Sequence, residues 1–163
     1  MLTSGERVSN ASQSNIGGLV GRNSGNIVAG SSQGSVRGYF QTGGLVGYNT
    51  GQVVSGQSAS QVFGNSYVGG LVGINEGNAA VVETSTANGA VNGIGGIGGL
   101  VGWNRGGRVL AGQAHGKVTA TGSEVGGLVG NFLWLLLLLE RLPASSGKSW
   151  YVLNFSVLLF CVS

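Results

Sequence analysis

The pentapeptide Gly-Gly-Leu-Val-Gly, here called the GGLVG phrase, occurs five times in the chain and decides its fold. The copies lie at residues 17–21, 43–47, 69–73, 98–102 and 126–130. Successive copies are separated by 26, 26, 29 and 28 residues, and the first four continue as Gly-x-Asn-x-Gly. A phrase of this length at a near-constant period indicates an internal repeat.

Each repeat contains two further stretches with the composition of short strands. In the second repeat these are residues 52–55 and 61–63, separated by Gly, Ser and Gln, which favour turns. Three strands in a unit of about 26 residues predict one triangular turn of a parallel β-helix. Each strand would pair with its equivalents about 4.8 Å above and below. The predicted fold is therefore an all-β solenoid of about five coils.

Three other readings of the repeat fit less well. Helix is disfavoured over residues 1–131, because glycine costs about 1 kcal/mol in a helix interior and no apolar stripe has the helical period. A β-propeller blade would need about 40–45 residues. A flexible glycine-rich linker has no reason to keep Leu and Val in register.

Alternation along the phrase assigns a direction to each side chain. One face carries the leucines and should line the interior: Leu19, Leu45, Leu71, Leu100 and Leu128. The asparagines share that parity and should stack as a ladder of amides at a corner: Asn23, Asn49, Asn75 and Asn104. The glycine two residues later suits a left-handed backbone. The valine of each phrase has outward parity unless the strand is kinked there, which the sequence leaves open.

The composition excludes most enzyme chemistry. Glycine supplies 34 of 163 residues, aspartate is absent, and His115 and Cys161 are the only residues of their kinds. One His and one Cys cannot build a zinc site within a single chain, and calcium loops depend on aspartate. The Gly-x-Gly-x-x-Gly match at residues 93–98 leads into another GGLVG phrase rather than a helix. We expect no catalytic, cofactor or metal site.

The charge pattern gives little sign of a nucleic-acid partner. The net charge is +3, and eight basic residues are scattered over the chain rather than gathered along a groove. The fourth repeat is locally basic and aromatic, with Trp103, Arg105, Arg108, His115 and Lys117.

One candidate ligand-contact column precedes the corner asparagines. It consists of Arg22, Tyr48, Ile74 and Trp103, which have outward parity. Aromatic rings and Arg suit contact with sugars or protein surfaces. The alternative is that this column varies because nothing constrains it. In the neighbouring column, Glu76 and Arg105 should be cross-strand neighbours.

The phrase and its continuation resemble the GLUG repeat, named for glycine-leucine-hydrophobic-glycine. The resemblance covers about residues 17–131 and rests on Gly-Gly-Leu-Val-Gly-x-Asn-x-Gly and on trailing pieces such as residues 34–38. It implies a β-solenoid in a large exported bacterial protein, such as a filamentous-haemagglutinin-like adhesin or some secreted peptidases. It brings no catalytic residues.

The chain departs from the pattern at both ends, which suggests three segments. Residues 1–16 read as a partial preceding coil without the features of a signal peptide. Residues 17–131 form the repeats. Residues 132–163 are a non-repeat apolar tail, read as frame-shifted or truncated, with Phe132 where a corner Asn belongs. We expect a helix at 132–142 and helix or strand at 150–162. Neither apolar run reaches the roughly 20 residues of a membrane span, so membrane contact of the tail is left open.

These observations favour a non-enzymatic, structural or adhesive segment of a bacterial surface or secreted adhesin. Its expected partners are a host glycan or protein surface and the flanking coils of a longer solenoid, with no nucleic acid. The alternative is an accessory repeat region of a secreted hydrolase or peptidase whose catalytic domain lies outside this chain. Binding to ice ranks last, because the threonines do not recur at the coil period.

Overall fold

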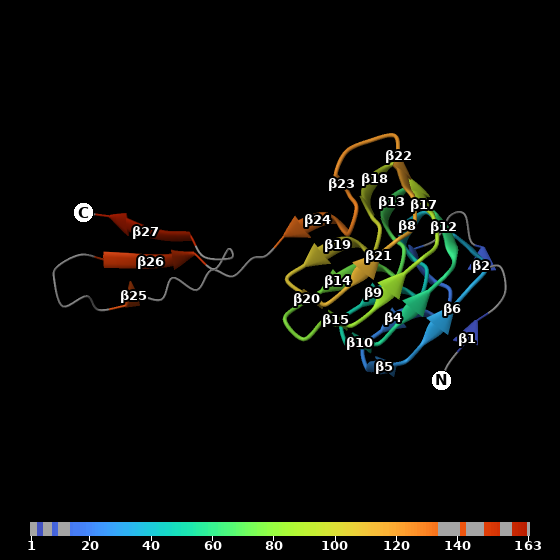
Figure 1. Ribbon diagram of the computed structural model, residues 1–163, viewed down its shortest axis with the longest axis horizontal. Coiled ribbons are helices and arrows are strands. Elements are labelled where there is room, and N and C mark those ends of the chain that lie inside the picture. Colours follow the sequence, from blue (N-terminus) through green and yellow to red (C-terminus); the bar gives the residue numbers. More distant parts are fainter. Residues whose placement is uncertain are drawn as a thin grey trace.

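The structure is a stack of β-coils in which equivalent residues of successive repeats lie over one another (Figure 1). The computed structural model describes residues 14–133 in full and, outside them, the backbone of five short strands at 3–4, 8–9, 141–142, 149–153 and 158–162. No helix occurs among the described residues. The coils make about four complete turns, from β3 (Ser14–Gly17) to β22 (Val118–Ala120).

Each turn contributes one strand to each of five parallel sheets, which we number in the order that the chain visits them. Sheet 1 contains β3, β8 (Phe40–Gly43), β13 (Ser66–Gly69), β18 (Gly95–Gly98) and β23 (Val125–Gly126). Sheet 2 contains β4 (Val20–Asn23), β9 (Val46–Asn49), β14 (Val72–Glu76), β19 (Val101–Arg105) and β24 (Val129–Leu133). Sheet 3 contains β5 (Asn26–Val28), β10 (Gln52–Val54), β15 (Val81–Glu83) and β20 (Arg108–Leu110).

The remaining two sheets complete the coil. Sheet 4 contains β1 (Thr3–Ser4), β6 (Ser31–Ser32), β11 (Gln57–Ser58), β16 (Thr86–Ala87) and β21 (Gln113–Ala114). Sheet 5 contains β2 (Val8–Ser9), β7 (Ser35–Arg37), β12 (Gln61–Phe63), β17 (Val91–Gly93) and β22. The prediction of a parallel β-solenoid is confirmed, but the expected three strands per coil were wrong, because sheets 1 and 4 were missed.

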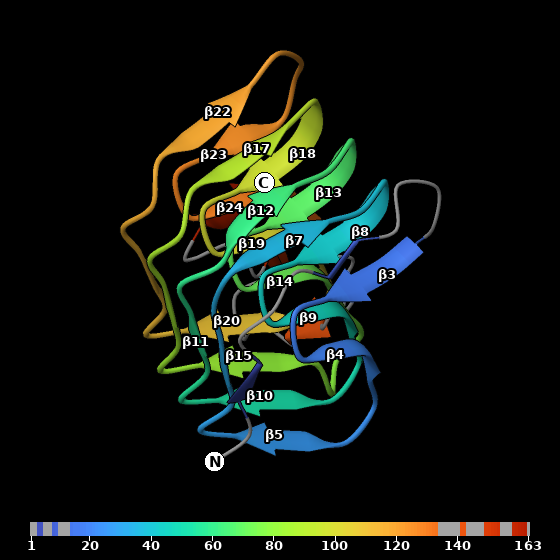
Figure 2. The same cartoon turned by 90° about the vertical axis from the view of Figure 1, so that its right-hand side faces the viewer.

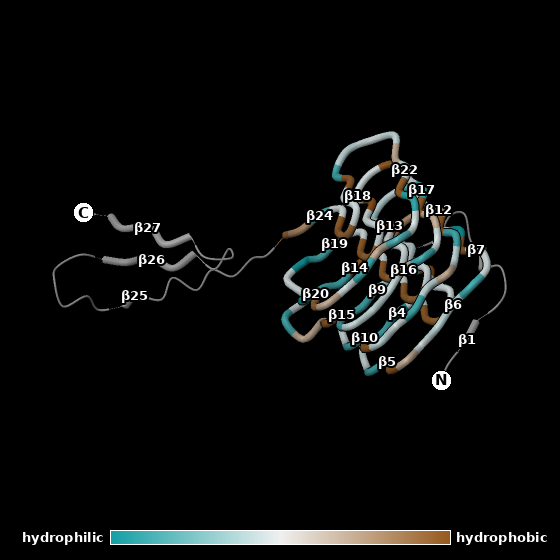
Figure 3. The backbone as a smooth tube through the Cα atoms, in the orientation of Figure 1, coloured by the Kyte–Doolittle hydropathy of each residue, from teal (hydrophilic) through white to brown (hydrophobic). Residues whose placement is uncertain are grey.

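The phrase supplies one continuous apolar column. Leu45, Leu71 and Leu100 are completely buried, and the amide of Leu45 donates to the carbonyl of Leu71 at 2.9 Å. Together with buried side chains of sheets 3 and 4, they form the first of two core clusters. Figure 3 shows apolar residues recurring at the same place on successive coils. At the last described coil Leu128 is 40% exposed, so the inward assignment holds where a further coil covers the leucine.

The valines of the phrase point inward as well, which corrects their outward parity. Val46, Val72 and Val101 are completely buried in the same cluster. The chain bends at the leucine, since the amides of Leu45 and Val46 both donate to the carbonyl oxygen of Leu71. Two successive side chains can therefore enter one core, which regular alternation would forbid.

A second core cluster lies between sheets 5 and 1. It contains Val36, Val62 and Val91 from sheet 5 and Val68 and Ile97 from sheet 1. In Figure 2 the strands β7, β12 and β17 run beside β8, β13 and β18 toward one tip of the coil. The cross-section consequently has two lobes, and the glycine pairs of the phrase lie where the lobes meet.

Left-handed backbone occurs mainly at positions that the sequence did not mark. Gly77 and Gly106 have positive φ, as expected for the glycine after the corner Asn, but Gly25 and Gly51 do not. Two other columns are left-handed in register and consist mostly of non-glycine residues. These are Asn15, Gln41, Tyr67, Gly96 and Glu124 in or beside sheet 1, and Ala29, Ser55, Thr84 and Ala111 after sheet 3.

The tail prediction is tested only in part. Residues 134–140, most of the expected helix, lie outside the described residues, while the described ends of that segment are strand, in β24 and β25 (Arg141–Leu142). β25, β26 (Ser149–Leu153) and β27 (Leu158–Val162) form an antiparallel sheet. β26 and β27 fall largely within the segment 150–162, where helix or strand was expected, and the helix expected at 132–142 lies mostly outside the described residues.

Replacing Thr42 by valine should stabilise the solenoid. Thr42 is completely buried in register with Ile16 and Val68, and its Oγ1 has no hydrogen-bond partner among the described residues. Valine keeps the shape and removes the unsatisfied hydroxyl, so the free energy of unfolding should rise by about 1 kcal/mol. Chemical denaturation measures this gain. The exposed Thr119 provides the control, since Thr119→Val should change stability little, and a loss of stability in Thr42→Val would contradict the argument.

Candidate functional site

The corner asparagines form a hydrogen-bonded chain through the interior of the solenoid. Asn49, Asn75 and Asn104 are completely buried and Asn23 nearly so. Each Nδ2 donates to the Oδ1 of the next coil at 2.8 Å, from Asn23 to Asn49, to Asn75 and to Asn104. Asn104 has no asparagine above it, since its register partner is Phe132, and its Nδ2 donates to the carbonyl of Gly107 at 2.7 Å. The ladder is therefore structural and offers no free polar group to a ligand.

The candidate contact column is aligned but does not present four exposed side chains. Tyr48 pairs in register with both Arg22 and Ile74, and Ile74 with Trp103. Arg22 is exposed, Tyr48 and Trp103 are half-buried, and Ile74 is only 2% exposed. Ile74 cannot contribute to a ligand site on this face.

The polar groups around this column interact with one another. The guanidinium of Arg22 lies 4.6 Å from the centre of the Tyr48 ring, and the Tyr48 hydroxyl donates to Glu76. Glu76 also pairs with Arg105 at 3.1 Å, which confirms the expected cross-strand neighbours. Partial burial, and then the hydrogen bond and negative charge of Glu76, raise the pKa of the Tyr48 phenol above its ordinary value. The phenol consequently remains a neutral donor at physiological pH.

The network ends on an aromatic stack. Arg105 lies 5.2 Å from the Trp103 ring, which stacks on Tyr67 of sheet 1 with ring centres 4.7 Å apart. Glu76 is shared between Tyr48 and Arg105. The rings of Tyr48 and Trp103 contact other side chains of the protein. We call these contacts the sheet-2 network, and their geometry indicates that they join adjacent coils.

The basic and aromatic residues of the fourth repeat do not converge. Trp103 and Arg105 lie in sheet 2 and Arg108 begins β20 in sheet 3. His115 follows β21 of sheet 4, where its ring contacts Gln113 at 3.2 Å, and Lys117 precedes β22 of sheet 5. These residues lie around the circumference of one coil, so they form no common site.

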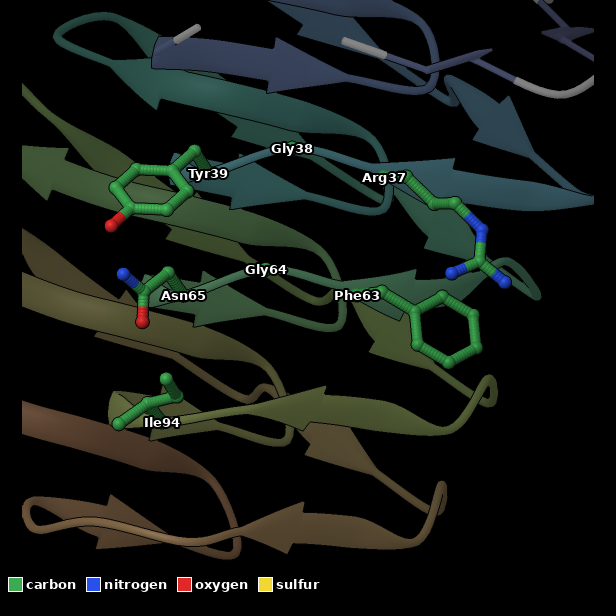
Figure 4. A pocket seen from close by; sticks show the side chains of 7 residues that line it. All are labelled: Arg37, Gly38, Tyr39, Phe63, Gly64, Asn65 and Ile94. Atoms are coloured by element: carbon green, nitrogen blue, oxygen red, sulfur yellow. The ribbon is translucent and has the colours of Figure 1, made fainter. Parts of the chain in front are cut away.

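A groove on another part of the surface was not anticipated. It lies where sheet 5 turns toward sheet 1 and has a volume of about 480 Å³. Gly38 and Gly64 form its floor, with Arg37 and Phe63 on one side and Tyr39, Asn65 and Ile94 on the other (Figure 4). We call it the tip groove. It crosses three coils, and its walls are built of residues in register, because Arg37 pairs with Phe63 and the carbonyl of Tyr39 accepts from the Asn65 amide.

The side chains of the tip groove combine apolar, polar and basic character. Tyr39 and Ile94 are 41% and 52% exposed, and the guanidinium of Arg37 lies 4.0 Å from the centre of the Phe63 ring. The equivalent positions hold unlike residue types, so no sequence motif marks them. The only residues near the groove that recur at the repeat spacing are the glycines Gly38, Gly64 and Gly93.

The described residues hold no group of three or more His, Cys, Asp or Glu side chains that could ligate a metal. They also include no helix with the length and apolar character required to cross a bilayer.

The fold defines a repeat protein of the parallel β-solenoid class. Residues 64–92 match the family model described as the GLUG motif, and this segment corresponds to nearly one turn, from β13 to β17. The match supports a GLUG repeat region in this chain. No curated protein and no solved structure matches the chain.

Proposed function

We propose that this chain is a structural and adhesive repeat segment of a bacterial surface or secreted adhesin. The observation that supports this role is the in-register stacking of all five sheets, in which each coil is a template for the next. Such a stack lengthens in one direction as coils are added and presents repeated outer columns along its side. An extended scaffold that carries exposed side chains is what attachment to a surface requires.

The proposed role involves no catalysis. The buried asparagines of the repeats are used in coil-to-coil hydrogen bonds. The exposed columns carry few ionisable groups, and the one carboxylate of the sheet-2 network, Glu76, already pairs with Arg105 and accepts from the Tyr48 hydroxyl. Flanking coils of a longer solenoid and a host surface are the partners that this arrangement suits.

In-frame deletion of residues 17–131 from the protein that carries them should reduce attachment of the bacterium to host cells. We expect antibodies against the repeats to label intact cells of the parent strain, and external protease to remove that label without lysis. Attachment counts and flow cytometry measure the two effects. A cytoplasmic marker provides the control for lysis.

The result also separates the proposal from its alternative. Unchanged attachment, combined with loss of a secreted hydrolytic activity in the deletion strain, would favour an accessory region of a hydrolase. Label that appears only after lysis would contradict the exported location.

A further inference from the structure

The tip groove has the shape and side chains of a site for a ligand with flat, partly apolar faces. The rings of Tyr39 and Phe63 lie on opposite sides of a floor that carries no side chains, since Gly38 and Gly64 form it (Figure 4). The aromatic rings offer large apolar faces to a ligand. Beside them, the side-chain amide of Asn65 can donate and accept hydrogen bonds. A sugar ring has this mixture of apolar and hydroxyl-bearing faces.

The charge of the groove selects the kind of ligand. Arg37 is exposed at its margin, and the only ion pair within residues 14–133 joins Arg105 to Glu76 on sheet 2. The guanidinium of Arg37 is thus not neutralised by a described carboxylate. An anionic group on the ligand would complete a charge-assisted hydrogen bond with it.

None of the described glutamates is among the residues that line this groove. Glu76 is in β14 of sheet 2 and Glu83 in β15 of sheet 3, both in the other lobe. Glu124 lies in the left-handed column of Gly96 and Tyr67, whose aromatic ring turns toward Trp103. The groove is therefore a locally cationic surface without competing acids in its lining.

A peptide strand fits this site less well than a saccharide. Peptides that add to a sheet need free backbone donors and acceptors at an edge. In the floor, the amide of Gly38 already donates to the carbonyl of Phe63 and that of Gly64 to Asn92, each at 3.0 Å. Recognition at this groove must use side chains, which favours a ligand with its own hydroxyl and anionic groups.

We propose that the tip groove binds an acidic saccharide. A sugar ring lies between Tyr39 and Phe63, and its carboxylate or sulfate contacts Arg37. The Asn65 amide hydrogen-bonds to ring hydroxyls. This proposal rests on the adhesive function above and gives it a ligand class. Binding to the purified chain is measured without cells, so an absence of saccharide binding would not contradict the surface location. Likewise, a failure of the cell-surface experiments would not contradict saccharide binding by the purified chain.

The test measures binding of three hexasaccharides to the full 163-residue chain by calorimetry or interferometry. A heparin hexasaccharide carries sulfate and carboxylate, a galacturonic acid hexamer carries carboxylate alone, and cellohexaose is neutral. We expect at least one acidic probe to bind with a Kd below about 1 mM, and cellohexaose at least tenfold more weakly. Which acidic probe binds better identifies the anionic group.

Two substitutions locate the binding in the groove. Arg37→Gln should weaken binding of the acidic probe about tenfold, because it removes one charge-assisted hydrogen bond. Tyr39→Ser, which changes no charge, should weaken it about fivefold through loss of ring contact. Arg22→Gln is the matched control: it removes the same charge and a similar contact with an aromatic ring, but on the sheet-2 network. It should leave the Kd within about twofold of the parent value.

Several outcomes would overturn the proposal. These are an absence of binding by both acidic probes, equal binding of cellohexaose, or equal weakening by Arg22→Gln and Arg37→Gln, which would indicate diffuse charge attraction. Equally tight binding of a poly-glutamate peptide with the same dependence on Arg37 and Tyr39 would assign the groove to acidic peptides instead. Thermal unfolding of each variant checks that the fold is retained.

Discussion

Replacing Gly70 by alanine should strongly destabilise the solenoid. Gly70 is the second glycine of the third phrase, where the two lobes of the coil meet. A Cβ there would lie 2.1 Å from the carbonyl oxygen of Gly99 and 2.9 Å from the Cβ of Ala87. Neither backbone can move without breaking ladders on both sides, so the loss should reach about 4 kcal/mol or more. That is a large part of the stability of an ordinary domain.

A glycine-to-alanine substitution at Gly127 provides the control, because an added Cβ would meet no neighbouring coil there. Gly127 occupies the equivalent position in the fifth phrase, and a Cβ there meets nothing within 4 Å. Gly127→Ala should therefore change the midpoint of thermal unfolding only slightly, while Gly70→Ala should lower it by about 10 °C or more. Circular dichroism during heating measures both. Equal effects of the two substitutions would show that close packing between coils does not impose glycine at this position.

Replacing Asn75 by alanine should cost about 3 kcal/mol, because the asparagine lies in the middle of the ladder. Its Nδ2 donates to Asn104 and its Oδ1 accepts from Asn49, both at 2.8 Å, and its side chain is completely buried. Alanine leaves the Oδ1 of Asn104 without that donor in the interior and opens a small cavity. Denaturant titration measures the change in the free energy of unfolding.

An exposed asparagine serves as the comparison for this prediction. Asn88 lies outside the core between β16 and β17, and Asn88→Ala should change the free energy of unfolding by no more than about 0.5 kcal/mol. A loss below about 1 kcal/mol for Asn75→Ala would mean that the surrounding carbonyls or water replace the ladder contacts.

The phrase and its continuation carried enough information to predict the solenoid, since a core leucine and a buried asparagine recur in them at fixed offsets. The number of strands was not predictable in the same way. Strands such as β6 (Ser31–Ser32) have two residues and no large apolar side chain, and β8 contains a left-handed Gln41. Short polar strands of this kind are held by the coils above and below them rather than by their own propensity.

The direction of the valines and the tip groove were beyond the sequence for different reasons. Val46 turns inward because the chain bends at Leu45, and a bend between two apolar residues leaves no compositional mark. The groove depends on register, which brings unlike residues such as Tyr39, Asn65 and Ile94 to one wall. Residue types that recur at the repeat spacing reveal the solenoid. The groove is lined by residues that differ between equivalent positions, so recurrence does not reveal it.

The stacking of the coils also determines how the molecule would respond to mechanical load. The backbone hydrogen bonds between successive turns, such as Leu45 to Leu71 and Leu71 to Leu100, run along the length of the stack. Tension applied at its two ends would load these bonds along their axes, one layer at a time, rather than shearing many together. Each released turn would add its 26 to 29 residues to the extended length of the chain. A tether built in this way would lengthen by unwinding turn after turn while the remaining turns stay intact.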